Sequence, residues 1–411
     1  MHMTDETITL GAVGDISLCR ACGEAVAEHG AGWPFAEMQP ALSQADLLFG
    51  NLESVVLPDD YPDEQIDPKG LVARFDATGA LAEAGFDVVN LAQNHILDGG
   101  HVAMFHTRRL VESLGIATAG VGRTQVEARR MRTLQAGPLR VGFLCYCEDT
   151  NYSLSTTGPC HAYYVLEDVL ADVAANAGEV DVLVVSIHAD LEFMETPSVP
   201  RREAFRRIAA AGATVVLGHH PHVPQGVEVI DGRLIAYSLG NFHFEAHTSD
   251  YMKANLPHTG HSFVLLAELS ADGVRAFRRV PFEIPPPPNQ RPVPLTGPAG
   301  ERMGQYLAEL DRMAGDDEVV RANWRRVALR HLDVYLERIK EMDAAKVLED
   351  LLGRLVLVAE NRGWVEEVFN VVRANWARQA GRIDPLHRPH YAFSSAKLPP
   401  VKGSTTPPAS V

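Results

Sequence analysis

The residues of this sequence that could take part in catalysis or bind a metal directly follow six short apolar runs. Each run is followed at once by Asp, Glu, Asn or His. The six polar segments are Gly14-Asp15, Gly50-Asn51-Leu52-Glu53, Asn94-His95-Ile96-Leu97-Asp98, His188-Ala189-Asp190, Gly218-His219-His220-Pro221-His222 and Ser238-Leu239-Gly240-Asn241-Phe242-His243. Imidazoles combined with carboxylates and amides are typical ligands of a divalent ion. The oxygen donors among them also suit a hard ion such as Ca²⁺, Mg²⁺ or Mn²⁺.

Each of these segments, taken singly, also has an ordinary structural explanation. An Asp after a strand is often a helix N-cap, Asn94 and Asp98 could be turn residues, and His219, His220 and His222 could be surface histidines. These explanations do not account for the same strand-then-polar order occurring six times. Because ligands of α/β sheets bind beyond the carboxyl ends of the strands, we expect the segments to meet at one rim.

The elements that must position these residues follow from the apolar pattern. Between residues 7 and 285, short apolar runs alternate with helical patterns, which predicts an α/β sheet covered on both faces. The predicted strands are Ile8–Val13, Leu47–Phe49, Val88–Leu91, Val141–Cys145, Val182–Ser186, Thr214–Leu217 and Leu234–Ser238. The predicted helices are Gly79–Ala84, Met104–Leu114, Glu167–Ala175 and Arg201–Ala211. Phe263–Leu269 and Val274–Val280, joined by four turn-forming residues, predict a closing β-hairpin.

After residue 283 the sequence changes from alternating strands and helices to a proline-rich segment followed by a helical pattern. Ile284-Pro285-Pro286-Pro287-Pro288 predicts a stiff linker, because Pro fixes φ and offers no backbone donor. We therefore predict a catalytic domain over residues 7–283, a linker over 284–299, a helical region over 300–380 and a tail over 381–411. VVRANW occurs at Val319–Trp324 and again at Val371–Trp376 and could mark two equivalent helices.

Charge and composition exclude several kinds of partner. The formal net charge of −16 repels phosphate backbones and anionic lipid, so we expect neither nucleic acid nor a membrane as partner. The N-terminal residues have no basic region followed by an apolar one, and no run of 18 apolar residues occurs, so a cytoplasmic location is expected. The five Cys have neither zinc-finger spacing nor a disulfide pattern, which favours buried thiols.

Four motifs resemble those of a known family. GDISL (14–18), GNLES (50–54), NLAQNHILDGG (90–100) and GHHPHVPQGVEVIDGRLIAYSLGNF (218–242) are similar to the CapA family of capsule and poly-γ-glutamate synthesis proteins. That family in turn resembles the calcineurin-like metallophosphoesterases. The resemblance implies an α/β fold built as a metallophosphoesterase β-sandwich flanked by helices, and it covers about residues 7–280. The helical C-terminal region has no counterpart in it.

The resemblance also implies a set of metal ligands. Asp15 takes the place of the first metal Asp, Asn51 or Glu53 that of the bridging carboxylate, and His188 that of a lone metal His. Asn94 matches a ligand Asn and His95 an acid/base His. His220 and His222 match a final pair of ligands, with His219 as a contender for one of the two places.

Two departures change what this ligand set could hold. Phosphoesterases begin with Asp-x-His, whereas the third residue here is Ser17, and the bridging position offers neutral Asn51 or the longer Glu53. We therefore expect one divalent metal ion, Ca²⁺, Mg²⁺ or Mn²⁺ rather than Zn²⁺, and no organic cofactor.

The soluble character and altered metal motif are similar to those of one enzyme type in the family, the epimerase that inverts the C-terminal residue of a lasso-peptide precursor. Inversion at Cα needs an acid/base group on each face and a group that stabilises the enolate. His95 with Asp15 or Asp98 is the first predicted pair, and His220 or His222 with Asp190 is the second. Arg20 and Arg74 are predicted to bind the substrate carboxylate, and Asn241 is a further predicted substrate contact.

Two alternatives stay open on the sequence alone. One is a metal-dependent hydrolase of a phosphoester or of a γ-glutamyl or peptide amide, which would use the same ligands. The other is a non-catalytic scaffold that binds a peptide or a synthetase. Retention of the whole set of Asp, Asn and His ligands together argues against a scaffold, because binding alone does not require it.

Overall fold

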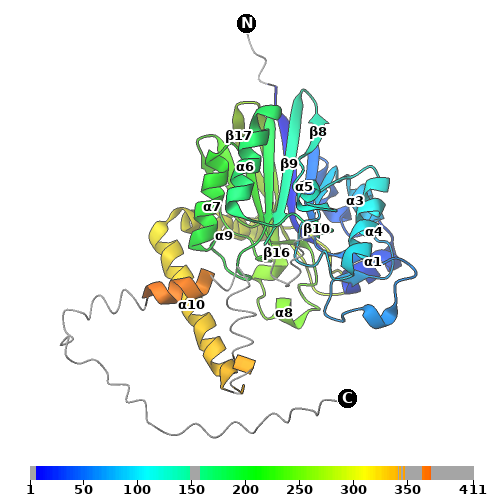
Figure 1. Ribbon diagram of the computed structural model, residues 1–411. Helices are drawn as coiled ribbons and strands as arrows, with labels where there is room; N and C mark the ends of the chain where they lie inside the picture. Colours follow the sequence, from blue (N-terminus) through cyan, green and yellow to red (C-terminus); the bar gives the residue numbers. More distant parts are fainter. Residues whose placement is uncertain (1–5, 149–157, 341, 344–345, 348–362, 372–411) are drawn as a thin grey trace, which may run out of the picture. The chain divides into compact units, whose positions relative to one another are not determined.

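Two β-sheets pack face to face, as the computed structural model shows in Figure 1. The structure describes residues 6–148, 158–340, 342–343, 346–347 and 363–371. The chain divides into two units, residues 1–368 and 369–411, and both sheets belong to the first. The predicted α/β sandwich flanked by helices is confirmed by this architecture.

The first sheet is mixed and has β1 near its centre. Its strands run in the order β18-β17-β16-β1-β2-β5-β6, and β15 pairs with the end of β1. β1, β2, β5 and β6 are parallel, whereas β16 joins β1 and β17 in antiparallel fashion. The bounds are β1 Ile8–Ile16, β2 Leu47–Leu52, β5 Val88–Asn90, β6 Ala117–Ala119, β15 Asn241–His243, β16 His261–Ser270, β17 Gly273–Glu283 and β18 Val293–Pro294.

The second sheet has the order β13-β14-β12-β11-β9-β8. Its four middle strands are parallel and its two edge strands are antiparallel to their neighbours. The bounds are β8 Arg132–Ala136, β9 Leu139–Cys147, β11 Val182–His188, β12 Val215–His219, β13 Val227–Ile230 and β14 Arg233–Ala236. All seven predicted strands and the predicted hairpin are therefore present, most of them a few residues longer than their apolar runs.

Alternation along the strands explains why both faces of each sheet are covered. In β9, Val141 and Phe143 point to the core between the sheets, whereas Leu144 and Tyr146 belong to the outer cluster. The rings of Phe49 and Phe143 stack between the sheets with centroids 5.8 Å apart. Each such buried side chain contributes about 1.5–3 kcal/mol, so this double-sided core fixes the register of the strands that carry the polar residues.

Helices cover the two outer faces (Figure 1). α1, α3 and α4 pack on the first sheet, and α6 and α7 pack on the second. Their bounds are α1 Arg20–His29, α3 Gly79–Ala84, α4 Gly100–Ser113, α6 Leu166–Asn176 and α7 Val199–Ala210. The four predicted helices are present, and α1 was not predicted. α7 begins where the Ser198 side chain accepts a hydrogen bond from the backbone N–H of Arg201, as expected of an N-cap.

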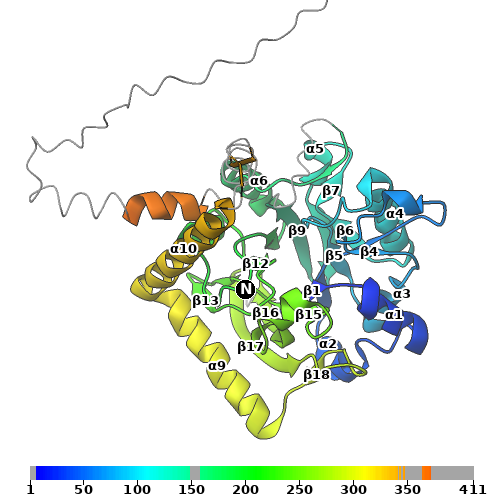
Figure 2. The same cartoon turned by 90° about the horizontal axis from the view of Figure 1, so that it is seen from below.

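Two long helices follow the sheets. α9 (Gly297–Gly315) runs alongside β13 and β17, as Figure 2 shows, and places Met303, Leu307 and Leu310 in the core between the sheets. α10 (Asp317–Ile339) contains the first VVRANW copy, and its Trp324 packs with Leu191. Most of the second copy and the predicted tail lie outside the described residues. The bounds of the four predicted segments stay predictions.

Two further features bear on the sequence-based expectations. All five cysteines are free and buried. Within the described ranges, no helix combines the length and the apolar character needed to cross a membrane.

Candidate metal centre and active site

The carboxyl ends of the parallel strands bring two rows of polar residues face to face. In the first sheet, Asp15 on β1 is in register with Asn51 on β2 and with Asn241 on β15, and Asn51 is in register with Asn90 on β5. In the second sheet, His188 on β11 is in register with His219 on β12. The register of the strands therefore brings the strand-end residues to one rim, as predicted.

Glycines before the polar residues allow the strands to approach this closely. A Cβ at Gly14 would lie 1.8 Å from the carbonyl oxygen of Gly240, and a Cβ at Gly218 would lie 1.8 Å from that of Tyr237. No side chain fits at either place, which explains the Gly-Asp and Gly-His sequences. Two histidines after Gly218, His220 and His222, have positive φ values of 94° and 57°. Such backbone conformations are rare outside glycine and cluster at functional sites.

Asn51 connects the two sheets by hydrogen bonds. Its Nδ2 donates to Asp15 Oδ1 at 2.8 Å and lies 3.1 Å from His188 Nδ1, while its Oδ1 accepts from Asn90 Nδ2 at 2.8 Å. The amide is thus occupied with protein partners on each side. Of the two residues predicted for the bridging position, Glu53 is the one whose oxygens remain available.

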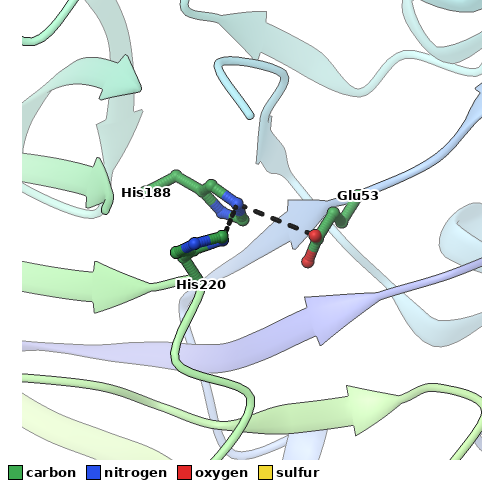
Figure 3. Close-up of side chains that lie close together, drawn as sticks. All are labelled: Glu53, His188 and His220. Carbon is green, nitrogen blue, oxygen red and sulfur yellow. Dashed lines mark hydrogen bonds and ion pairs between the residues drawn. The ribbon is translucent and has the colours of Figure 1, made fainter. Parts of the chain in front are cut away.

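Glu53, His188 and His220 form the best candidate for a metal centre (Figure 3). Glu53 Oε1 lies 3.7 Å from His188 Nε2, which lies 3.2 Å from His220 Nδ1. Asn94 Oδ1 is 2.8 Å from the same His188 nitrogen. Two other groups overlap with this one, Glu192 with His220 and His222, and Asp15 with Glu53 and His222.

The burial of Glu53 tests whether these residues fit a cation. Its side chain is fully buried, and neither carboxylate oxygen has a hydrogen-bond partner in the part of the chain that the structure describes. A buried carboxylate that accepts no hydrogen bond is destabilising, and a divalent ion bound between it and two imidazoles would remove that penalty. Carboxylate, amide and imidazole donors together suit such an ion. The residues present therefore fit a divalent ion, whose identity stays a prediction.

Ser17 occupies the position at which the sequence departs from the Asp-x-His pattern. Its side chain is buried and lies 3.2 Å from the thiol of Cys19. The position therefore carries a hydroxyl in contact with a thiol, in place of the imidazole that the resemblance led us to compare it with. The single ion expected from the sequence stays a prediction, because three overlapping groups of residues could hold an ion.

Burial and neighbouring charges shift the pKa values of the groups in the candidate metal centre. Burial and the neighbouring His220 hold the pKa of His188 well below its usual range. Burial, reinforced by His222, lowers the pKa of His220 to about 3. Burial raises the pKa of Glu53 well above its usual range. These two imidazoles are therefore neutral, which is the form that binds a metal.

Asp15 and His222 are shifted in the opposite sense. Burial alone would raise the pKa of Asp15, but contacts with His219 and His222 hold it well below its usual range. Burial alone would lower the pKa of His222, but Glu53, Asp15 and Glu192 raise it to about 10. In the absence of a metal, the Glu53–His222 pair therefore holds at least one proton at neutral pH.

Two imidazoles flank the candidate metal centre in matching poses. His95 Nδ1 lies 2.7 Å from Asp98 Oδ2, and its Nε2 lies 4.0 Å from Glu53 Oε1. His222 Nδ1 lies 2.9 Å from Asn241 Oδ1 and 3.4 Å from Asp15 Oδ2, and its Nε2 lies 3.8 Å from the same Glu53 oxygen. In both rings the Nδ1 is held by a protein oxygen, so the Nε2 of each is directed to the centre.

A cavity of about 1010 Å³ opens onto these groups. His95, His220 and His222 line it together with Asn94, and Phe244 and Tyr251 supply aromatic surface. Tyr251 donates a hydrogen bond to Glu192, whose carboxylate lies 3.8 Å from His222 Nε2. The cavity therefore brings an extended ligand to two imidazoles and one candidate metal centre.

The structure gives four residues protein partners in place of their predicted roles: Asp190, Arg20, Arg74 and Asn241. Asn241, predicted to contact substrate, is buried outside the cavity lining and holds His222. Asp190 is not the partner of His220 or His222 in the described residues. Its Oδ2 accepts from the backbone N–H of Ser198 at 2.8 Å, at the start of α7, and Arg201 lies beside it. The strand-end position of Asp190 was correctly predicted, but the chain turns there with φ 95°, which takes its carboxylate to α7.

The two predicted substrate-binding arginines also have protein partners. Arg74 is paired with Asp63, whose side chain is 90% exposed, and Arg74 also donates to the carbonyl oxygen of Tyr61. Arg20 lines the cavity, but its Nη2 donates to the carbonyl oxygens of Lys69 at 2.6 Å and Gly70 at 2.9 Å. Arg20 therefore fastens a loop, and Arg74 lies outside the cavity lining.

Sequence reasoning missed four residues of this site. Asn90 completes the hydrogen-bonded row, Glu192 faces His222, Glu245 pairs with Arg20 at 3.4 Å, and Lys69 lines the cavity. Asn90 could have been found, because it ends an apolar strand as the other site residues do. The other three lie in loops, where no periodic pattern marks them.

A comparison of the sequence with models of protein families shows which family the chain belongs to. A family model described as "Bacterial capsule synthesis protein PGA_cap" matches residues 9–246. The chain belongs to the PGA_cap family. The match includes every predicted metal ligand and ends before α9.

Several curated proteins are related to this PGA_cap member. "Capsule biosynthesis protein CapA" of Bacillus anthracis is 32% identical over 59% of this chain and 61% of its own length. "PGA biosynthesis protein CapA" of Bacillus subtilis is 25% identical over 68% of this chain and 73% of its own length. "Probable polyglutamine synthesis accessory protein Rv0574c" of Mycobacterium tuberculosis is 29% identical over 51% and 59%. The chain thus spans about three fifths of the length of the first of these relatives.

Solved structures with a similar arrangement share little sequence. A hypothetical protein from Thermus thermophilus matches with a TM-score of 0.41 and 17% identity over 68% of this chain and 100% of that one. The 5'-nucleotidase from Candida albicans matches with a TM-score of 0.39 and 11% identity over 77% and 60%.

Proposed function

We propose that this PGA_cap member is a metal-dependent acid/base enzyme that acts on a peptide and inverts the Cα of its C-terminal residue. A ribosomal precursor peptide of the lasso type, in the cytoplasm, is the substrate we favour, with neither nucleic acid nor a membrane as partner. The observation that carries the proposal is the matching pose of His95 and His222. Each ring is held at Nδ1 by a protein oxygen and directs Nε2 to the same Glu53 oxygen.

Two imidazoles are what inversion at carbon requires. The Nε2 of one neutral ring removes the Cα proton, and the N–H of the other ring delivers a proton to the opposite face, so that the net proton count is unchanged. Asp98 and Asp15 hold the rings and stabilise the charged form of each. A divalent ion held by Glu53, His188, His220 and Asn94 would polarise the carbonyl group next to the Cα.

A peptide is supported as the substrate class by three observations. The cavity of about 1010 Å³ is large enough for several residues of an extended chain. A relative is described as a polyglutamine synthesis accessory protein, and polyglutamine is itself a polyamide. Aromatic surface at Phe244 and Tyr251 offers contact to an apolar side chain near the reacting carbon.

Deuterium exchange tests the proposal directly. The full chain is incubated in D₂O with a linear precursor peptide that ends in an aromatic residue, with and without a chelator. We expect one deuterium at the terminal Cα and appearance of the D-residue, both suppressed by the chelator. His95→Ala and His222→Ala should each lose inversion. Inversion at the wild-type rate in either variant would contradict the two-imidazole assignment.

A metal-dependent hydrolase is the second candidate. It is favoured by the buried Glu53, His188 and His220 group, which would also serve to activate water for attack on a phosphoester or on a γ-glutamyl or peptide amide. Hydrolysis needs only one acid/base group beside the metal, so it leaves one of the two held imidazoles without a role. Release of phosphate or of a peptide fragment in the same incubation, without Cα exchange, would decide for the hydrolase.

A further inference from the structure

An arginine and a lysine, Arg20 and Lys69, line the cavity, and they differ in what they already bind. Arg20 donates to the carbonyl oxygens of Lys69 and Gly70 and pairs with Glu245 at 3.4 Å. The ammonium group of Lys69 has no hydrogen bond or ion pair with any residue that the structure describes. Lys69 is therefore the cation of this cavity that can receive an anionic group of a ligand.

The loop that carries Lys69 is held by hydrogen bonds on both sides of this residue, and one of them reaches the acid/base machinery. The backbone N–H of Lys69 donates to Asp67 Oδ1 at 2.8 Å, and its carbonyl oxygen accepts from Arg20. Two residues on, the backbone N–H of Leu71 donates at 2.7 Å to Asp98 Oδ2, the same oxygen that holds His95. The Lys69 backbone is thus fixed on the His95 side of the cavity.

The negative charge around the cavity favours a cation at the place where an anionic ligand binds. Glu192 and Glu245 also line the cavity, and the whole chain carries a formal net charge of −16. A free carboxylate that enters this field is repelled unless a positive group compensates it. In a C-terminal residue the carboxylate is attached to the Cα itself, so the compensating group must lie close to the acid/base imidazoles.

We propose that Lys69 binds the C-terminal carboxylate of the substrate and so restricts the enzyme to peptides that end in a free acid. This inference rests on the proposed function. It makes Lys69 a specificity-determining residue, with Arg20 as the positioning residue that holds its loop. It also assigns to Lys69 the recognition that the sequence alone suggested for Arg20 and Arg74.

The test compares one aromatic-ended peptide in two forms, the free acid and the C-terminal carboxamide. Binding is measured by calorimetry and Cα exchange by mass spectrometry, for the full-length wild type, Lys69→Met, Lys69→Arg and the control Lys253→Met. Lys253 is an exposed lysine on the short helix α8 (Asp250–Lys253), outside the cavity lining. All four proteins should fold alike, because Lys69 and Lys253 are both exposed.

We expect the wild type to bind the free acid more tightly than the carboxamide, by about tenfold or more. Lys69→Met should lose this preference and leave carboxamide binding unchanged, whereas Lys69→Arg and Lys253→Met should keep it. A wild type without preference for the free acid, or a Lys69→Met variant that retains the preference, would overturn the inference. Absence of Cα exchange in the wild type would instead refute the proposed function, since the binding comparison does not depend on turnover.

Discussion

Replacing Asp98 by Asn tests whether this carboxylate acts through His95. Asp98 Oδ2 lies 2.7 Å from His95 Nδ1 and 2.7 Å from the backbone nitrogen of Leu71. An Asn side chain has the same shape and keeps one oxygen that can accept both hydrogen bonds. The substitution therefore removes the negative charge while changing the geometry little.

The size of the effect follows from the kind of hydrogen bond that is changed. A hydrogen bond to a charged group contributes about 1.5–3 kcal/mol and a neutral one about 0.5–1.5 kcal/mol. The difference of about 1–2 kcal/mol corresponds to a rate reduced about 5- to 30-fold. Loss of the imidazole in His95→Ala should cost more, because a positioned acid or base contributes about 10²- to 10⁴-fold.

Rates of Cα deuterium uptake in D₂O would be measured for the wild type, Asp98→Asn, His95→Ala and the double variant. Because Asp98 acts on the reaction only through the His95 ring, the double variant should be no slower than His95→Ala alone. The reasoning fails if the two losses multiply in the double variant, or if Asp98→Asn reacts at the wild-type rate. An unchanged melting temperature of Asp98→Asn would show that the bond to Leu71 survives.

Four other perturbations have defined outcomes. Glu53→Gln and His188→Ala should each weaken binding of a divalent ion at least about tenfold in calorimetry, because each removes one of a few ligands. The control Arg74→Ala should leave binding of the ion unchanged. The Glu53–His222 pair holds a proton that the divalent ion must displace. Affinity for the ion should therefore rise by up to about tenfold per pH unit between pH 6 and 8, with measurable proton release. An affinity for the ion that does not change with pH would show that no proton is displaced. Arg20→Met should lower kcat, because the loop of residues 68–70 loses the hydrogen bonds that Arg20 donates to it. A kcat equal to that of the wild type with a raised KM would instead make Arg20 a substrate contact. Arg201→Met should destabilise the protein by about 3–5 kcal/mol in urea unfolding, because the buried Glu148 loses its partner at 2.7 Å, whereas Arg312→Met, at an exposed pair, should have no measurable effect.

The sequence by itself determined the strands, their order along the chain and the residues at their ends. Apolar alternation is a local property, and it marked β1, β9 and β11 because both faces of these strands are buried. Polar residues at the end of a buried strand are conspicuous for the same reason, so Asp15, His188 and His220 could be predicted as site residues. Ser17 and Asn51 could likewise be recognised as departures from a two-metal pattern without any coordinates.

Only the tertiary structure decided which groups pair with which. Asp190 turns to the N-terminus of α7, whereas Glu192, two residues later, faces His222. Arg20 reaches carbonyl oxygens almost fifty residues away, and this left Lys69 as the cation open to a ligand. Such partnerships depend on the direction of single side chains and on contacts between distant loops. Neither leaves a periodic trace in the sequence, because loop backbones are set by local turns and by the partners that the fold brings to them.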